Sequence, residues 1–172
     1  MKRVVIWLKT ADRQDVTLSE LGRQAAWEAL CHFTGQTREE LDQSGIVLKK
    51  HSNGKPFFEE SHIGVSISHT SKTKKAVAAA AVCEGEVGVD IEDALRKSWK
   101  VAKRMFLQQE QDWMQEHEDG RFAQIWTLRE SYAKWTGLGL AKMPAVEFWI
   151  KENGDIRCSD TECSAFSFCV PD

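Results

Sequence analysis

Two acidic motifs, roughly forty residues apart, carry residue types that could bind a metal ion and phosphate. The first is Gly88-Val-Asp-Ile-Glu92, and the second is Trp126-Thr-Leu-Arg-Glu-Ser-Tyr-Ala-Lys134. Together they supply three carboxylates and one ammonium group, from Asp90, Glu92, Glu130 and Lys134. Mg²⁺ takes oxygen ligands, keeps several waters and bridges to substrate phosphates. The two motifs therefore predict a Mg²⁺ and phosphate site.

The spacing within each motif predicts how these side chains are presented. In a strand, the aliphatic residues of 87–91 would point to one face, while Asp90 and Glu92 project from the other, roughly 6.6 Å apart. Glu130 and Lys134 are four residues apart and share one helix face. Taken singly, the first pair also fits a solvated strand face. The second also fits a surface ion pair worth about 0.3–0.5 kcal/mol.

Composition narrows the class of protein. With 172 residues, 42% of them hydrophobic, and seven tryptophans, the chain can form one domain or two small lobes sharing a core. A net charge of −3 argues against general nucleic-acid binding, which needs a basic surface. The apolar run Val4–Leu8 is too short for a secretory signal or a membrane span, so we expect a first strand and no membrane partner. Five cysteines without CxxC spacing suit a reducing cytosol, so we expect a cytoplasmic protein.

The first half of the chain predicts one helix and several strands. Thr17-Leu-Ser-Glu20 resembles a capping box that opens a helix, and Gly35 is a natural stop for it. Asn53-Gly-Lys-Pro56 has strong turn chemistry. The predicted strands are Val4–Leu8, Ile46–Lys49, Gly64–His69 and Ala76–Cys83, although the alanines of the last run would also suit a helix. Arg38–Asp42 is predicted as a short helical or turn segment.

The second half repeats the order of strand, helix and strands. After the Asp90 strand we expect a long amphipathic helix over Ser98–His117 and a second helix over Phe122–Thr136. Val146–Ile150 and Ala165–Val170 are predicted as closing strands around an Asn153-Gly154 turn. The chain thus divides into an N-terminal lobe, 1–83, and a C-terminal lobe, 84–172, which carries the acidic motifs.

These motifs resemble the signature of the 4′-phosphopantetheinyl transferase superfamily, which pairs a Gly-Val-Asp-x-Glu strand with a Trp-Ser/Thr-x-Lys-Glu-Ala-x-x-Lys helix. Gly54-Lys-Pro56, Ser66-Ile-Ser-His-Thr70 and Gly22-Arg-Gln-Ala-Ala26 are similar to segments of its larger, pseudo-dimeric branch, the surfactin and enterobactin synthetase type. Val101-Ala-Lys-Arg-Met-Phe106 with Glu110 resembles a Phe-x-x-x-Glu helix. The resemblance covers roughly residues 20–150.

The resemblance implies transfer of the phosphopantetheine arm of coenzyme A to a serine of an acyl or peptidyl carrier protein, with release of adenosine 3′,5′-bisphosphate. It places Mg²⁺ on Asp90, Glu92 and Glu130. Glu130, or a water that it holds, becomes the candidate base for the carrier serine. Lys134 would bind phosphate oxygens as a point charge.

Further residues would bind coenzyme A on this resemblance. His69 would hydrogen-bond a phosphate, while Lys55 and Arg23 would lie near the nucleotide and its 3′-phosphate. Pro56, in the Gly-Lys-Pro motif, and Ser68, in the Ser-Ile-Ser-His-Thr motif, are the remaining residues expected to bind coenzyme A.

Three departures from the family pattern stand out. Arg129 replaces the usual lysine, which keeps the charge but puts a rigid fork in place of a flexible ammonium. Thr70-Ser71 stands where Ser-Gly is commoner, and the region before Lys55 is short. Two alternatives therefore stay open: a non-catalytic member that binds coenzyme A or a carrier protein, and another Mg²⁺-dependent enzyme that hydrolyses pyrophosphate bonds.

The expected fold is α+β: two similar lobes, each a small antiparallel sheet packed on a long helix, related by a pseudo-twofold axis with the active site between them. One such chain would do what the shorter branch does by assembling subunits, so we expect a monomer. Two basic clusters are either solvated faces or a dock for an acidic carrier helix. They are Lys72, Lys74 and Lys75, and Lys97, Lys100, Lys103 and Arg104.

Overall fold

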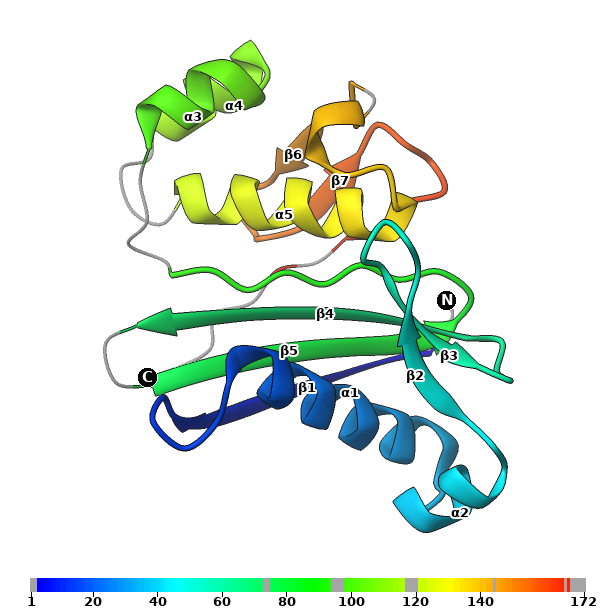
Figure 1. Ribbon diagram of the computed structural model, residues 1–172. Helices are drawn as coiled ribbons and strands as arrows, with labels where there is room; N and C mark the ends of the chain where they lie inside the picture. Colours follow the sequence, from blue (N-terminus) through cyan, green and yellow to red (C-terminus); the bar gives the residue numbers. More distant parts are fainter. Residues whose placement is uncertain are drawn as a thin grey trace.

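The computed structural model describes residues 3–72, 75–93, 98–116, 121–143, 145–165 and 167 (Figure 1). It has a mixed α+β fold, with small antiparallel sheets and five α-helices in these ranges. This confirms the predicted fold class, whereas the pseudo-twofold relation and the division at residue 83 stay predictions. No helix in the described ranges is both long enough and apolar enough to cross a bilayer.

The N-terminal part is built on a three-stranded antiparallel sheet with the order β1-β5-β4. Its strands are β1 (Val4–Asp12), β4 (Ile63–Lys72) and β5 (Lys75–Glu84). The central strand β5 is buried through most of its length, which explains its continuous apolar run. β4 lies at one edge of the sheet, a position that matters for the site described below.

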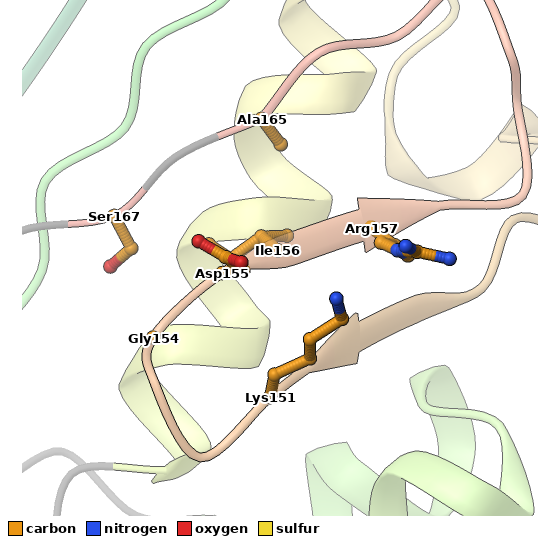
Figure 2. Close-up of a pocket in the computed structure, with 7 residues that line it drawn as sticks. All are labelled: Lys151, Gly154, Asp155, Ile156, Arg157, Ala165 and Ser167. Atoms are coloured by element: carbon orange, nitrogen blue, oxygen red, sulfur yellow. The ribbon is translucent and has the colours of Figure 1, made fainter.

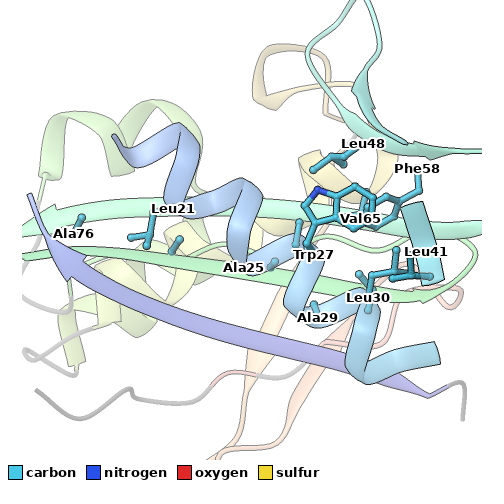
Figure 3. Packing of buried hydrophobic residues seen from close by; sticks show 14 residues of the cluster. Leu21, Ala25, Trp27, Ala29, Leu30, Leu41, Leu48, Phe58, Val65 and Ala76 are labelled. Carbon is cyan, nitrogen blue, oxygen red and sulfur yellow. The ribbon is translucent and has the colours of Figure 1, made fainter. Parts of the chain in front are cut away.

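Helix α1 (Leu18–Thr34) packs on one face of this sheet. Its predicted capping box is confirmed, since the Thr17 hydroxyl accepts a bond from the Glu20 amide at 3.2 Å and the Glu20 carboxylate accepts one from the Thr17 amide at 3.0 Å. Gly35 ends the helix in the left-handed region, at φ 75°. The buried side chains of α1 pack with those of the sheet in one cluster, as Figure 3 shows for Leu21 and Leu30.

A short helix and a hairpin extend this core. The elements are α2 (Arg38–Gln43), β2 (Val47–Lys50) and β3 (Pro56–Glu59), and β2 pairs antiparallel with β3. Leu41, Leu48 and Phe58 are buried in the α1 cluster (Figure 3). The hairpin is thereby fixed against the sheet, with its turn at residues 51–55 projecting toward the C-terminal part.

The C-terminal part contains three α-helices, a 3₁₀ turn and a hairpin. They are α3 (Trp99–Met105), α4 (Gln108–Glu116), α5 (Arg121–Thr136), η1 (Leu140–Lys142), β6 (Phe148–Ile150) and β7 (Ile156–Cys158). Leu128 and Tyr132 of α5 form a buried cluster with Val146 and Phe148. α5 thus packs against the β6–β7 hairpin and links it to the acidic segment that follows β5.

The prediction of one helix over Ser98–His117 is wrong. The chain is extended at Phe106, with φ −99° and ψ 146°, and this separates α3 from α4. The Leu107 amide then donates to the Glu110 carboxylate at 2.9 Å, which satisfies a free N–H group at the start of α4. Two short helices result, and His117 lies outside the described residues.

The predicted pairing of the last strands is also wrong. The Asn153-Gly154 turn is present, with Gly154 at φ 85°, but β6 pairs across it with Ile156–Cys158. The strand β7 was not among the predicted strands. Ala165 is described and lies in no strand, while residues 166 and 168–170 of the predicted strand lie outside the described residues.

Candidate functional site

The acidic segment Gly88–Glu92 is not a ladder strand, contrary to the prediction. It runs irregularly between β4 and α5 (Figure 1). Side chains satisfy the backbone of Val89: its N–H donates to the Ser66 hydroxyl at 3.0 Å, and its carbonyl accepts from Lys134 at 3.2 Å. The alternation itself is confirmed, because the three aliphatic side chains Val87, Val89 and Ile91 pack together with alanines of β5.

A glycine allows this segment to approach α5 closely. A Cβ atom on Gly88 would lie 1.9 Å from the Ser131 carbonyl oxygen and 2.8 Å from the Trp135 amide nitrogen. Both are backbone atoms, so no side-chain rotation would relieve the overlap. Gly88 therefore sets the distance at which Asp90 faces the last turns of α5.

Asp90 and Lys134 bring the two acidic motifs together, as the sequence predicts. Lys134 Nζ lies 2.6 Å from Asp90 Oδ1, and the Ser68 hydroxyl donates to the same oxygen at 2.7 Å. The Asp90 side chain is only 8% exposed, whereas that of Lys134 is 30% exposed. A buried carboxylate is thus neutralised by a lysine that still reaches solvent and can exchange one anionic partner for another.

The other two predicted metal ligands are half-buried and engaged in interactions of their own. Glu92 accepts a bond from the Asp93 amide at 2.9 Å, and Glu130 also has a partner. In the described part of the chain, no three Asp, Glu, His or Cys side chains are grouped closely enough to hold a metal ion. The three carboxylates have the chemistry that Mg²⁺ prefers. Because Asp90 Oδ1 already accepts two hydrogen bonds, the metal site stays a prediction.

Lys55 lies against the C-terminal end of α5. Its ammonium donates to the Trp135 carbonyl at 2.8 Å and pairs with Glu86. Asn53 supports the contact by donating to the Gly137 carbonyl at 3.2 Å. A cation beside the last carbonyl groups of a helix is favourable because it meets the negative end of the helix dipole. The structure therefore places Lys55 beside the turn of α5 that carries Lys134.

His69 and Arg23 lie on the other side of β4. Side chains alternate along a strand, so Ser68 faces the acidic segment while His69 faces α1. A Cβ atom on Gly22 would lie 3.7 Å from the His69 ring, and both His69 and Arg23 are exposed. Pro56 is half-buried at the start of β3. The predicted coenzyme A residues therefore surround the edge strand β4 instead of lining one face.

Arg129 belongs to the core of the C-terminal part. Its guanidinium donates to Glu110 Oε2 from Nε at 3.0 Å and from Nη2 at 2.5 Å, and Nη2 also reaches the Val146 carbonyl at 3.2 Å. The two side chains are 4% and 2% exposed. The sequence carried a signal for each member of this buried pair: the Phe-x-x-x-Glu pattern for Glu110 and the basic residue before Glu130 for Arg129. Sequence reasoning noted both signals but did not predict that the two side chains pair.

A separate cavity of about 310 Å³ lies beside the β6–β7 hairpin (Figure 2). Its charged side chains are Lys151, Asp155 and Arg157. None of the residues predicted from the sequence for binding or catalysis lines it. The cavity is therefore distinct from the cluster at Asp90.

Comparisons with known proteins show one family to which part of the chain is similar. Residues 86–169 match the sequence model described as the 4′-phosphopantetheinyl transferase superfamily. The chain is also 31% identical over 117 residues to a protein named 4′-phosphopantetheinyl transferase gsp from Aneurinibacillus migulanus. That alignment covers 66% of this chain and 47% of the relative, so the chain spans about half the relative's length. Both acidic motifs fall within the region matched by the family model, so this part of the chain is similar to the 4′-phosphopantetheinyl transferase superfamily.

Proposed function

We propose that this protein transfers the 4′-phosphopantetheine arm of coenzyme A to a serine of an acyl or peptidyl carrier protein. The observation that carries the proposal is the contact between the two acidic motifs, in which Lys134 lies 2.6 Å from the buried Asp90. A partly exposed ammonium held on a carboxylate can exchange that partner for the phosphate of an incoming ligand. The similarity of residues 86–169 to the transferase superfamily supports the same reaction.

In the proposed reaction, the carrier serine oxygen attacks the β-phosphorus of coenzyme A. A new phosphorus–oxygen bond forms, the pyrophosphate bond breaks, and adenosine 3′,5′-bisphosphate leaves. Glu130 would accept the serine proton, directly or through water, because it lies one turn before Lys134 on α5. Lys134 would stabilise charge on the phosphate oxygens. Mg²⁺ held by Asp90, Glu92 and Glu130 would supply further charge compensation when bound.

Coenzyme A would bind around the edge strand β4. Lys134 would meet the pyrophosphate near the end of α5, with Pro56 and Ser68 nearby. Lys55, expected from the resemblance near the nucleotide, is here proposed for the pyrophosphate instead, because it donates to the Trp135 carbonyl at 2.8 Å beside Lys134. His69 and Arg23, on the α1 side, would meet the nucleotide and its 3′-phosphate. Binding around an edge strand allows one extended ligand to reach both sides of the sheet.

The carrier protein would dock on α3. Trp99 is 45% exposed, and Lys100, Lys103 and Arg104 are exposed beside it. Positive charge accelerates encounter with an acidic carrier helix. Charge reversal at Lys100 and Arg104 should raise the carrier KM at low salt, and an unchanged KM would exclude α3 as the dock.

In the two predicted basic clusters, Lys74 and Lys97 lie outside the described residues. We further propose that the protein works as a cytoplasmic monomer.

Intact-mass spectrometry of apo carrier proteins tests the transferase directly. Each carrier is incubated with the protein, coenzyme A and Mg²⁺, with EDTA as the control. A gain of one phosphopantetheine that EDTA removes is the expected result. Asp90→Ala and Glu130→Ala should abolish it, whereas Lys151→Ala, at the separate cavity, should not. Full activity of either carboxylate variant would contradict the site assignment.

A binding-only member of the family is the second candidate. It is favoured by the saturation of Asp90 Oδ1, which accepts bonds from both Ser68 and Lys134. Calorimetric binding of coenzyme A, combined with no mass gain on any carrier, would support this candidate. Cleavage of coenzyme A without a carrier would indicate a hydrolase instead.

A further inference from the structure

Two buried serines of β4 face the acidic segment. Ser66 is 3% exposed and Ser68 is 7% exposed, and their positions two residues apart put both hydroxyls on one face of the strand. Buried hydroxyl groups normally have hydrogen-bond partners. Here the partners are adjacent residues: the Val89 amide donates to the Ser66 hydroxyl at 3.0 Å, and the Ser68 hydroxyl donates to Asp90 Oδ1 at 2.7 Å.

Lys134 binds the same two residues from the side of α5. It donates to the Val89 carbonyl at 3.2 Å and to Asp90 Oδ1 at 2.6 Å. The lysine is flexible and 30% exposed, whereas the serines are fixed by the strand ladder, in which Ser66 pairs with Ala81 and Ser68 with Ala79. The contacts from β4 are therefore the rigid half of this arrangement.

The contacts made by Lys134 and those made by Ser66 and Ser68 should respond differently when phosphate binds. If Lys134 moves to a phosphate oxygen, Asp90 loses its counter-charge and Val89 loses a donor. The bonds from Ser66 and Ser68 do not depend on the lysine and can persist. The segment would then keep its position through the exchange, with Ser66 holding the backbone and Ser68 holding the carboxylate.

We propose that Ser66 and Ser68 are positioning residues, which hold Val89 and Asp90 in place while Lys134 exchanges from Asp90 to the phosphate of coenzyme A. The proposal rests on the proposed transferase function; it adds Ser66 to the site and gives Ser68, already expected there, a positioning role. Neither serine needs to touch the reacting atoms. Their effect should therefore appear in turnover more than in affinity for coenzyme A.

Hydrogen exchange of the Val89 amide, followed by NMR, tests the role of Ser66 without any activity. Ser66→Ala removes the acceptor of this amide, so its exchange should accelerate about tenfold or more. Ser159→Ala is the matched control, because the Ser159 hydroxyl accepts a bond from the Glu147 amide at the same 3.0 Å distance. In the control, Val89 exchange should stay as in the wild type. Wild-type exchange in Ser66→Ala would overturn the proposed role of Ser66.

Two variants of nearly equal shape test Ser68. Ser68→Thr keeps the hydroxyl and Ser68→Val removes it, so cavity and packing effects largely cancel between them. We expect kcat for transfer to be about tenfold lower in the valine variant than in the threonine variant, with the KM for coenzyme A within about twofold. Equal kcat values would overturn the proposal for Ser68.

A third readout separates failure of this proposal from failure of the proposed function. The carboxyl carbon of Asp90 should show different NMR shifts in Ser68→Thr and Ser68→Val, because only the first donates to it. If the wild type transfers nothing but this difference appears, the transferase assignment fails and the positioning contact stands. If the wild type is active and the shifts coincide, the positioning role is excluded.

Discussion

Replacing Arg129 by methionine should destabilise the protein strongly, although Arg129 precedes the proposed base Glu130. The structure places Arg129 in the core, on Glu110, and not beside the Asp90–Lys134 pair. Methionine is similar in length but removes the charge and every donor. The substitution therefore tests whether Arg129 stabilises the core or takes part in the proposed reaction.

The size of the effect follows from what Glu110 would lose. Its Oε2 accepts bonds from Arg129 and from the Leu107 amide, while its Oε1, also buried, has no hydrogen-bond partner among the described residues. Removing the guanidinium leaves a buried carboxylate with one donor, which costs about 3–5 kcal/mol. The whole free energy of unfolding of a typical domain is only about 5–15 kcal/mol. Arg129→Lys keeps the charge but loses the two-pronged guanidinium contact and the bond to Val146, so we expect the free energy of unfolding to fall by about 1–2 kcal/mol.

Urea unfolding followed by tryptophan fluorescence measures these differences. Trp113 and Trp126 pack against the cluster around α4 and α5 and should report on it. The double variant Glu110→Leu/Arg129→Met should recover much of the loss, because it removes the buried charge together with its partner. Two results would refute this assignment: Arg129→Met within 1 kcal/mol of the wild type, or full stability with complete loss of transfer.

Three further predictions rest on single contacts. Burial and a hydrogen bond to Asp160 raise the pKa of Tyr132 from 10.0 to about 12, so the fold favours the neutral phenol. The corresponding stability is fully present below pH 10 and is lost between pH 10 and pH 12, a loss that urea midpoints should show and that Tyr132→Phe should lack. Gly88→Ala should cost about 1–3 kcal/mol by overpacking, more than Gly154→Ala, where a Cβ atom meets open space and only the strain of the left-handed backbone is added, and equal thermal shifts would contradict this. Lys55→Met should cost about 1 kcal/mol or less, because its partner Glu86 is 64% exposed, yet should weaken coenzyme A binding measured by calorimetry.

The elements predicted correctly from the sequence are those whose signals are local. The capping box at Thr17 and the left-handed Gly35 define the ends of α1 within a few residues of chain. The continuous apolar run of β5 likewise reflects burial on both faces. The residues that define the ends of α1 are neighbours in sequence, so a pattern is sufficient there. The alanine-rich run of β5 would also have suited a helix, and its burial comes from α1 on one face and Val87, Val89 and Ile91 on the other.

The wrong predictions concern segments whose partners are distant in sequence. Gly88–Glu92 has the alternation of a strand, but Ser66 and Lys134 take the hydrogen bonds that a neighbouring strand would have made. The helix predicted over Ser98–His117 breaks where Glu110 caps the Leu107 amide. Periodicity shows which side chains are buried, and it does not show which groups satisfy the backbone.

The motifs also indicated candidate site residues, but they did not show on which side of the sheet each residue lies. Ser68 and His69 are adjacent, yet one faces Asp90 and the other faces α1 beside Gly22. If coenzyme A passes around the β4 edge, its two ends meet different groups and should respond to different substitutions. His69→Ala should raise the KM for coenzyme A with little change in kcat. It should also reduce the preference for coenzyme A over 3′-dephospho-coenzyme A, because the missing group is the phosphate that His69 would bind. An unchanged preference in His69→Ala would place the 3′-phosphate elsewhere and remove the reason for a ligand that spans both sides of the strand.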